Sequence, residues 1–330
     1  MIDPTNKLEI AAWIAAAAPG AQLASDSRRV RQGDVFFAYP GEGGRDGRAF
    51  IGAAIEQGAA AIVCEARGLV WDARWNVPHL GVPELKKRAG PVAHAYYAMP
   101  DAAMFTVGVT GTNGKTSCAL WLGQAFAKLG QGGAVIGTLG VGLFQPRSQP
   151  VFDATGYTTP DAVLLARTLA EARDAGAGAL AIEVSSIGLD QGRVDGMHFD
   201  AALFTNLTRD HLDYHGDPDA YEAAKSALFD WPGLKTAVLN LDDPVGPRLL
   251  ARIQSRPHNA VAVTGYTLRG AAAVPDIDGV LMLRASALRS RPAGTYFHLG
   301  CALGSAQVKT RLVGHFNISN ALAVRHCPWR

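Results

Sequence analysis

The sequence predicts an α/β protein with two parts: a small N-terminal α/β unit and a larger P-loop ATPase-like domain with a mostly parallel sheet. Short apolar, β-branched runs alternate with segments of helical periodicity, the order of parallel strands covered by helices on both faces. Met104–Leu129 passes from such a run through a glycine-rich turn into a helical segment, which is typical of a phosphate-binding loop. The 330 residues can bury two cores, and Met99-Pro100-Asp101 marks a boundary, so we place the domains at residues 1–100 and 101–330.

The first hundred residues contain the elements of the small unit. A helix is predicted over Lys7–Ala18, ended by Pro19-Gly20, and a connecting helix over Pro83–Met99. Between them we expect a strand, a helix and a second strand, at Val35–Ala38, Gly47–Gln57 and Ala60–Cys64.

The larger domain continues the alternation of strands and helices. A helix is predicted over Thr159–Ala175 with Pro160 in its first turn, and another begins at Pro218 after the capping residue Asp217. Residues 260–312, with short apolar runs between Gly, Pro and Arg, are expected to be β-rich. Further strands are predicted at Ala134–Leu139, Leu180–Val184, Ala201–Phe204 and Thr236–Leu239. Ligands of such sheets gather at the carboxyl ends of the strands.

The composition excludes several classes of protein. Lys and Arg together number 31 against 29 Asp and Glu, a net charge of +2, so no nucleic-acid partner is expected. The longest apolar run, Ile10–Ala18, is too short to cross a bilayer, so we expect no membrane insertion. The four cysteines include no C-x-x-C pair, which fits a reduced cytoplasm; they are Cys64, Cys118, Cys301 and Cys327.

The glycine-rich turn carries the groups that bind phosphate. Gly111 and Gly114 allow backbone N–H groups to face phosphate oxygens, Lys115 adds a positive charge, and Thr116 offers a hydroxyl to Mg²⁺. The turn departs from the general P-loop pattern, which asks for a glycine where Val109 stands. A lone G-K-T occurs by chance in many chains, but the flanking strand and helix favour the phosphate-binding interpretation.

Two further stretches could hold a metal ion. Glu183 closes an apolar run, where a buried carboxylate needs a positive partner such as Mg²⁺, although a carboxylate that simply faces solvent fits equally well. His211 and His215 are four residues apart with Asp210 and Asp213 nearby, a spacing that suggests zinc. Without a third strong ligand, we favour a hard cation such as Mg²⁺.

Taken alone, neither Lys225 nor the turn at Asp26-Ser27-Arg28 indicates a function, but both belong to a wider pattern. A lysine two turns into a helix is usually a solvated surface residue, and such a polar turn is usually plain loop structure. Both nevertheless belong to a series of strings that runs in order along the chain: D-S-R, G-T-N-G-K-T, T-T-P, E-V-S-S, Q-G-R, T-N-L-x-R-D-H-L-D-Y-H-G, Y-E-A-A-K and G-x-F-N-x-x-N-A-L-A.

This series resembles the Mur ligases, and within them the MurE type, which extends UDP-N-acetylmuramoyl-L-alanyl-D-glutamate. The resemblance covers about Ser25 to Val324, with Ile187 standing where many members have histidine. It implies ATP-dependent ligation of an amino acid, expected to be meso-diaminopimelate, to the D-glutamate carboxylate through an acyl phosphate. The partners it implies are the nucleotide sugar, ATP with Mg²⁺, and the diamino acid, bound by a cytoplasmic monomer.

The resemblance also implies a role for each matching residue. Lys115, Lys225 and His211 would be catalytic, and Lys225 would carry CO₂ as a carbamate (N6-carboxylysine). Thr116, Glu183, His211 and carbamylated Lys225 would face metal ions. ATP would lie on Gly111, Thr112, Asn113, Gly114, Lys115, Thr116, Ser117 and Asn320. The uridine and muramoyl peptide would lie on Ser27, Gly43, Gly44, Arg45, Thr158, Thr159, Ser185, Gln191 and Arg193.

Two expectations concern the end of the chain and the alternatives. Arg325–Arg330 replaces the continuation of a helix, which predicts that the family's third domain is absent, through a frameshift, a truncated gene or natural trimming, and that this chain alone is inactive. The alternatives are a non-catalytic fragment that binds the nucleotide sugar and another ligase of the superfamily, such as a folylpolyglutamate or cyanophycin type. The D-S-R, T-T-P and Q-G-R strings argue against the last.

Overall fold

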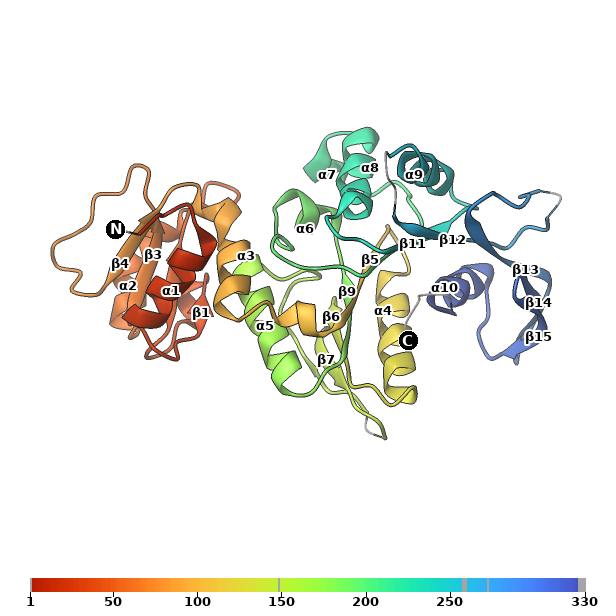
Figure 1. Ribbon diagram of the computed structural model, residues 1–330, viewed down its shortest axis with the longest axis horizontal. Helices are drawn as coiled ribbons and strands as arrows, with labels where there is room; N and C mark the ends of the chain where they lie inside the picture. Colours follow the sequence, from red (N-terminus) through yellow and green to blue (C-terminus); the bar gives the residue numbers. More distant parts are fainter. Residues whose placement is uncertain (1, 148, 257–259, 272, 326–330) are drawn as a thin grey trace. The chain divides into compact units, whose positions relative to one another are not determined.

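The computed structural model describes residues 2–147, 149–256, 260–271 and 273–325, arranged in two compact units (Figure 1). The first unit is Met1–Ala103 with two later segments, Pro160–Gly176 and Gln191–Met197. The second unit holds Met104–Thr159, Ala177–Asp190 and His198–Arg330. The assignment of functional domains at residues 1–100 and 101–330 stays a prediction. The chain end after Arg325, with Cys327, lies outside the described residues.

A four-stranded parallel sheet organises the first unit. Its strands follow the order β1 (Leu23–Ala24), β2 (Val35–Ala38), β3 (Ala61–Glu65) and β4 (His79–Val82). Side chains alternate along β2, so Val35 and Phe37 enter one apolar core while Phe36 and Ala38 enter another. The helices are α1 (Lys7–Ala17), η1 (Ser27–Arg29), η2 (Gly47–Phe50), α2 (Ile51–Glu56), α3 (Leu85–Tyr96), η3 (Pro100–Ala103) and α5 (Ala162–Asp174).

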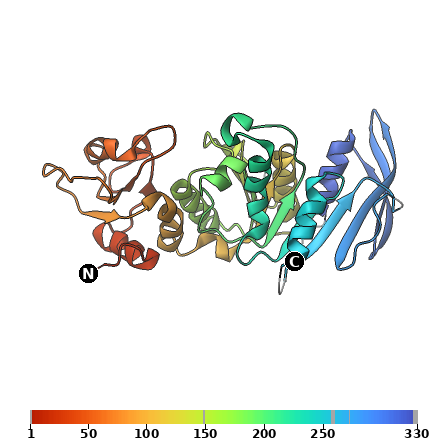
Figure 2. The ribbon, with the colours of Figure 1, turned by 90° about the horizontal axis from the view of Figure 1, so that it is seen from above.

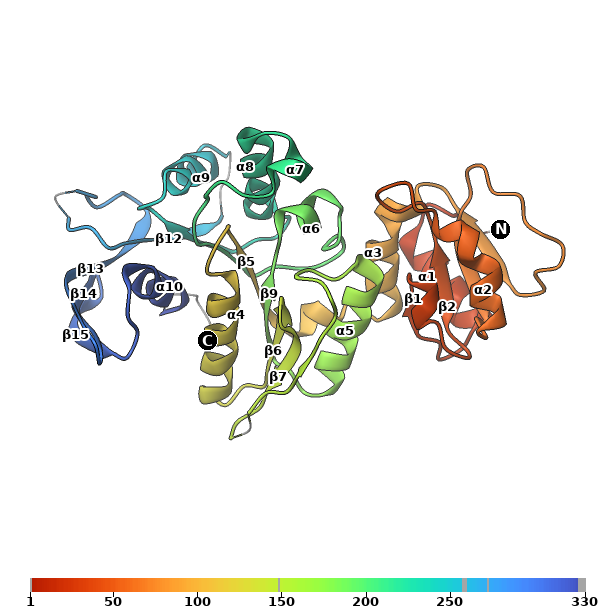
Figure 3. The same cartoon turned by 180° about the vertical axis from the view of Figure 1, so that it is seen from behind.

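An eleven-stranded sheet organises the second unit, in the order β15-β14-β13-β12-β11-β10-β5-β9-β6-β7-β8. Pairing is parallel from β13 through β6 and antiparallel beyond both of these strands. Figures 2 and 3 show the ribbon from above and from behind the view of Figure 1. The strands are β5 (Phe105–Thr110), β6 (Gly133–Gly137), β7 (Gly140–Phe144), β8 (Phe152–Asp153), β9 (Ala179–Glu183), β10 (Ala201–Phe204), β11 (Thr236–Asn240), β12 (Ala262–Thr267), β13 (Val280–Arg291), β14 (Gly294–Cys301) and β15 (Gly304–Thr310).

Helices pack on this second sheet and complete its core. Val107 and Val109 of β5 share one apolar cluster with Leu122 and Phe126 of the following helix and with Ile318 of the last one. The helices are α4 (Lys115–Lys128), α6 (Ser186–Asp190), α7 (Leu212–His215), α8 (Pro218–Ser226), η4 (Ala227–Asp230), α9 (Val245–Gln254) and α10 (His315–Arg325). No helix in the described part of the chain is long and apolar enough to cross a membrane.

The α/β prediction and its mostly parallel sheet are confirmed, with local corrections. Pro160 does not start α5; Asp161 caps it instead, because its carboxylate accepts from the N–H groups of Val163 and Leu164, both at 3.1 Å. The strand predicted to reach Leu139 ends at Gly137, because the chain reverses into β7 through Gly140, whose φ is 104°. The β-rich region is confirmed, and its strands extend the main sheet.

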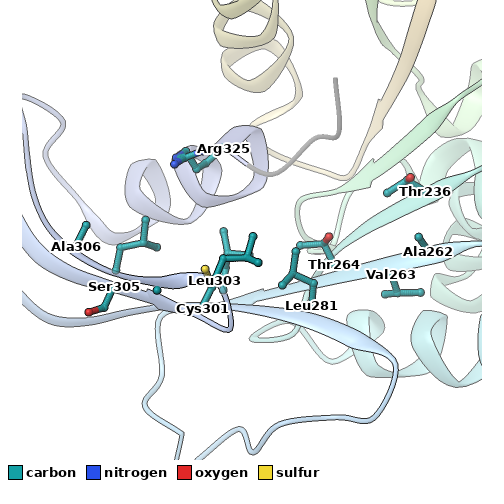
Figure 4. A pocket seen from close by; sticks show the side chains of 13 residues that line it. Thr236, Ala262, Val263, Thr264, Leu281, Cys301, Leu303, Ser305, Ala306 and Arg325 are labelled. Atoms are coloured by element: carbon teal, nitrogen blue, oxygen red, sulfur yellow. The ribbon is translucent and has the colours of Figure 1, made fainter. Parts of the chain in front are cut away.

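A pocket of about 670 Å³ lies on the β12–β15 part of this sheet (Figure 4). Leu281, Leu299 and Leu303 give it a largely apolar lining, and Arg325 of α10 is the one charged side chain among the described residues that line it. Thr236, Thr264 and Ser305 add hydroxyl groups to this lining.

Asp161 provides a test of this packing. Its carboxylate caps α5 and also accepts a 2.6 Å hydrogen bond from the hydroxyl of Ser25, so Asp161→Ala removes both interactions. We expect a loss of about 1–2 kcal/mol in the unfolding free energy, measured by urea denaturation. Asp174→Ala, at the exposed end of the same helix, is the control and should have little effect; equal losses would contradict the prediction.

Candidate active site

The phosphate-binding loop lies between β5 and α4, where tight contacts demand glycine. Gly111 has φ 141° and Gly114 has φ 87°, both in the left-handed region. A Cβ added at Gly111 would lie 2.0 Å from Oγ1 of Thr205, and one at Gly114 would lie 2.6 Å from Oδ1 of Asn320. A larger residue would therefore clash with Thr205 at the first position or with Asn320 at the second, in a strained backbone conformation.

Lys115 begins α4 and folds its side chain back over the loop. Its Nζ donates to the carbonyl oxygens of Gly111 and Thr112, each at 2.9 Å. Burial lowers the pKa of Lys115, while the negative charges of Glu183 and Asp210 oppose this shift. The N-cap residue, Gly114, makes no side-chain capping bond, so the first N–H groups of α4 are available to an anion.

Glu183 ends β9 and is 1% exposed, so the alternative of a carboxylate facing solvent is wrong. Its carboxylate accepts from Oγ1 of Thr116 at 3.0 Å, and from the N–H and Oγ1 of Thr138 at 2.9 and 3.2 Å. These hydrogen bonds compensate for its burial. Thr116 and Glu183 together offer the hydroxyl and carboxylate oxygens that fit Mg²⁺.

Lys225 is buried, contrary to the usual expectation for a lysine on a helix. Asp217 caps α8 and Pro218 begins it, as predicted, and Lys225 lies two turns further on with 3% exposure. Its Nζ donates to the carbonyl oxygen of Gly111 at 3.0 Å and lies 4.6 Å from the centre of the Tyr221 ring. Burial, and then the positive charge of Lys115, lower the pKa of Lys225 to about 7, against the opposing charge of Asp210. The neutral amine therefore becomes accessible near neutral pH.

The two histidines do not form a zinc site with their neighbours. His211 stands at the N-cap position of α7 with φ 51° but makes no capping bond with its side chain, and its Nε2 lies 3.6 Å from Oδ2 of Asp210. His215 packs against Tyr221 with ring centres 5.4 Å apart, and burial lowers its pKa. Across residues 2–325, leaving out 148, 257–259 and 272, no three or more His, Cys, Asp or Glu residues are grouped to hold a metal ion.

The loop opens into a pocket of about 580 Å³ that is rich in asparagine. It brings together four residues that the sequence predicted for ATP: Asn113, Gly114, Ser117 and Asn320. The other lining residues were missed as site residues, although most of them belong to the T-N-L and F-N-x-x-N strings. They are Asn206, Thr208, Asn240, Phe316, Asn317 and Ser319.

Three of the predicted substrate residues in the second unit lie around the end of β9. The hydroxyl of Thr159 donates to the carbonyl of Glu183 at 2.8 Å and lies 3.1 Å from Oγ of Ser185. Thr158 is 3.2 Å from the hydroxyl of Thr138, which itself donates to Glu183. The predicted substrate and metal residues of this unit are thus joined by hydrogen bonds.

The other predicted substrate residues belong to the first unit. Ser27 begins η1, which Asp26 caps. Gly43 and Gly44 adopt φ values of 66° and 76°, in a loop that the N–H of Gly41 closes by donating to the carbonyl of Arg45 at 2.7 Å. Arg193 donates from Nε and Nη2 to Oε1 of Gln191, at 2.9 and 2.7 Å.

Taken together, the sheet, the glycine loop and the lysine at the helix start define a phosphate-loop α/β protein. Family models agree and add detail: the Mur ligase middle domain matches residues 109–327, and the Mur ligase catalytic domain matches residues 21–97. The chain belongs to the Mur ligase family.

Individual relatives show which type of Mur ligase the chain resembles. The chain is 59% identical over 324 residues to the UDP-N-acetylmuramoyl-L-alanyl-D-glutamate–2,6-diaminopimelate ligase of Janthinobacterium sp. (strain Marseille), covering 98% of this chain and 63% of that protein. It is 47% identical to the ligase of the same name from Ralstonia nicotianae, with 94% and 60% covered. A solved structure with that name superposes with a TM-score of 0.73 at 32% identity, covering 92% of this chain and 58% of the other. The chain thus spans about three-fifths of the length of these relatives.

The environment of Lys225 gives a direct prediction. The amine should titrate near pH 7, and Lys115→Gln should raise its pKa because a neighbouring positive charge is removed. The measurement is an NMR titration of ¹³Cε-labelled lysine, with the exposed Lys128 as internal control. A Lys225 signal that titrates together with Lys128 would contradict this picture.

Proposed function

We propose that the whole protein is an ATP-dependent ligase of peptidoglycan precursor synthesis. It joins an amino acid to the D-glutamate carboxylate of UDP-N-acetylmuramoyl-L-alanyl-D-glutamate in the cytoplasm, acting as a monomer. The observation that carries the proposal is the convergence of Lys115 and Lys225 on the carbonyl of Gly111, beside the uncapped start of α4. The names of the similar proteins supply the substrate, and 2,6-diaminopimelate is the amino acid.

The reaction needs charge neutralisation and positioning more than covalent catalysis. The glutamate carboxylate attacks the γ-phosphorus of ATP, which forms an acyl phosphate and releases ADP. The amine of the amino acid then attacks the acyl carbon, and phosphate leaves. Lys115 and the N–H groups at the start of α4 stabilise negative charge on the phosphates.

Thr116 and Glu183 are the residues that would hold Mg²⁺ in this protein. Their oxygens already lie 3.0 Å apart, and His211 is a further ligand of the proposal. When bound, the ion supplies positive charge to the phosphate oxygens and shields them from the attacking carboxylate.

Lys225 is proposed to carry CO₂ as a carbamate. Its neutral amine attacks the carbon of CO₂, a new N–C bond forms, and one proton is lost to solvent. The lowered pKa supports this step because only the neutral amine can react. The product is an anion able to hold a second Mg²⁺ close to the phosphate loop, since Nζ starts 3.0 Å from the oxygen of Gly111.

The remaining predicted residues are proposed to bind the nucleotide sugar. Ser27 and the loop at Gly43, Gly44 and Arg45 hold the uridine and diphosphate. The muramoyl peptide is assigned to Thr158, Thr159, Ser185, Gln191 and Arg193, whose hydroxyl, amide and guanidinium groups suit its carboxylates and amides.

The proposed reaction is tested by phosphate release in the whole protein. Release should require the nucleotide sugar, ATP and diaminopimelate together, and folate should not replace the nucleotide sugar.

Lys115→Ala should weaken ATP binding by about 10–100-fold, because a charge-assisted contact is lost, while affinity for the nucleotide sugar stays nearly the same. Lys128→Ala, at the exposed end of the same helix, is the control. Unchanged ATP binding in Lys115→Ala would refute the phosphate-loop assignment.

The carbamate is tested separately in the whole protein. Lys225→Ala should abolish ligation, and short carboxylic acids should restore part of it by supplying the missing oxygens. Restoration should be absent in Lys115→Ala, because a carboxylate cannot replace an ammonium group. If no acid restores Lys225→Ala and mass spectrometry at high CO₂ finds Lys225 unmodified, the carbamate proposal fails.

A further inference from the structure

The segment that follows β10 is bonded to the phosphate loop along its length. The N–H of Thr112 donates to the carbonyl of Asn206 at 2.8 Å, and the hydroxyl of Thr205 donates to the carbonyl of Asn113 at 2.6 Å. Further along, the N–H of Thr208 donates to Oγ1 of Thr112 at 2.9 Å. The two segments therefore form one hydrogen-bonded layer.

Asn206 makes the most specific of these contacts. Its Oδ1 accepts from the N–H of Asn113 at 3.1 Å, and its Nδ2 donates to the carbonyl of the same residue at 3.0 Å. The carboxamide thus pairs with Asn113 as the backbone of a neighbouring β-strand would, and it satisfies both the N–H and the carbonyl of Asn113. Because the two ends of the amide have opposite roles, this pairing fixes both the side chain and the peptide groups that flank Asn113.

The two backbones also meet closely at Gly111. A Cβ there would lie 2.9 Å from the carbonyl oxygen and 3.1 Å from the nitrogen of Asn206. The glycine at the start of the loop is therefore required by Asn206 and its neighbour Thr205 as much as by any phosphate group. This contact leaves the loop little freedom to move away from Asn206.

The hydrogen bonds to Asn206 determine which backbone N–H groups of the loop can still bind an anion. The N–H groups of Thr112 and Asn113 are already engaged by Asn206, through its carbonyl and its Oδ1. The first N–H groups of α4 lack a side-chain cap. The N–H groups at the start of α4 can therefore bind a phosphate group, whereas those of Thr112 and Asn113 cannot while they are bonded to Asn206.

We propose that Asn206 is a positioning residue for the phosphate loop, acting on the triphosphate through Asn113. The inference rests on the proposed nucleotide site but assigns a role that the proposed reaction does not include. The competing role is a direct contact with the base or ribose, because Asn206 also lines the asparagine-rich pocket. The two roles differ in how a loss of affinity depends on the number of phosphates.

The first experiment measures dissociation constants of ATP, ADP and adenosine for Asn206→Ala. We expect ATP affinity to fall about tenfold, ADP affinity to fall less, and adenosine affinity to stay unchanged. The matched control is Asn317→Ala, in the same pocket, whose amide donates to the carbonyl of Val313 and not to the loop. Its effect should not grow with the number of phosphates. Equal losses for adenosine and ATP in Asn206→Ala would overturn the positioning role.

Hydrogen exchange gives a readout that needs no nucleotide. The N–H of Asn113 should exchange faster in Asn206→Ala and in the shape-conserving Asn206→Leu, which serves if the alanine variant does not fold. Unchanged protection of Asn113 in a folded variant would overturn the proposal.

A double-mutant cycle separates this inference from the proposed nucleotide site. If Asn206 acts through the loop, the ATP loss of Lys115→Ala combined with Asn206→Ala should be smaller than the product of the single losses. Multiplicative losses would overturn the positioning role alone. Unchanged ATP binding in Lys115→Ala would instead remove the nucleotide site.

Discussion

Two lysine amines, one buried and one partly buried, meet at one carbonyl oxygen, and much of the site depends on this contact. Lys115 from α4 and Lys225 from α8 both donate to Gly111, at 2.9 and 3.0 Å. Two like charges this close are costly, and burial together with the charge of Lys115 lowers the pKa of Lys225 to about 7. The arrangement is stable because Lys115 retains carbonyl partners and Lys225 lies over the face of Tyr221.

Glu183 complements this positive centre from the neighbouring strand. Its three hydrogen bonds to Thr116 and Thr138 satisfy the oxygens of a carboxylate that is closed to solvent. A Cβ at Gly137 would lie 2.1 Å from Oε1 of Glu183, so that glycine makes room for the carboxylate. The site is therefore preorganised: its polar groups are held by the fold before any substrate binds.

Much of this arrangement could be predicted from local signals. The bounds of β2 and β10, the Asp217-Pro218 start of α8 and the glycine loop all follow from short-range chemistry that is visible in the residues themselves. Local signals do not predict the burial of Lys225 or the pairing of Asn206 with Asn113. Both depend on contacts across about a hundred residues, which leave no periodicity in the sequence. The cap at Asp161 was missed for a simpler reason, since proline and aspartate both favour a helix start.

The two edge strands of the large sheet are β8 and β15. At one edge, β8 has only two residues, too few to pair with another chain. At the other edge, β15 is mostly exposed and polar, and Lys309 lies 5.4 Å above the ring of its cross-strand neighbour Tyr296. A brief strand and a charged one are both poor templates for intermolecular β-pairing. The eleven-stranded sheet of the described residues is therefore protected against aggregation at both edges.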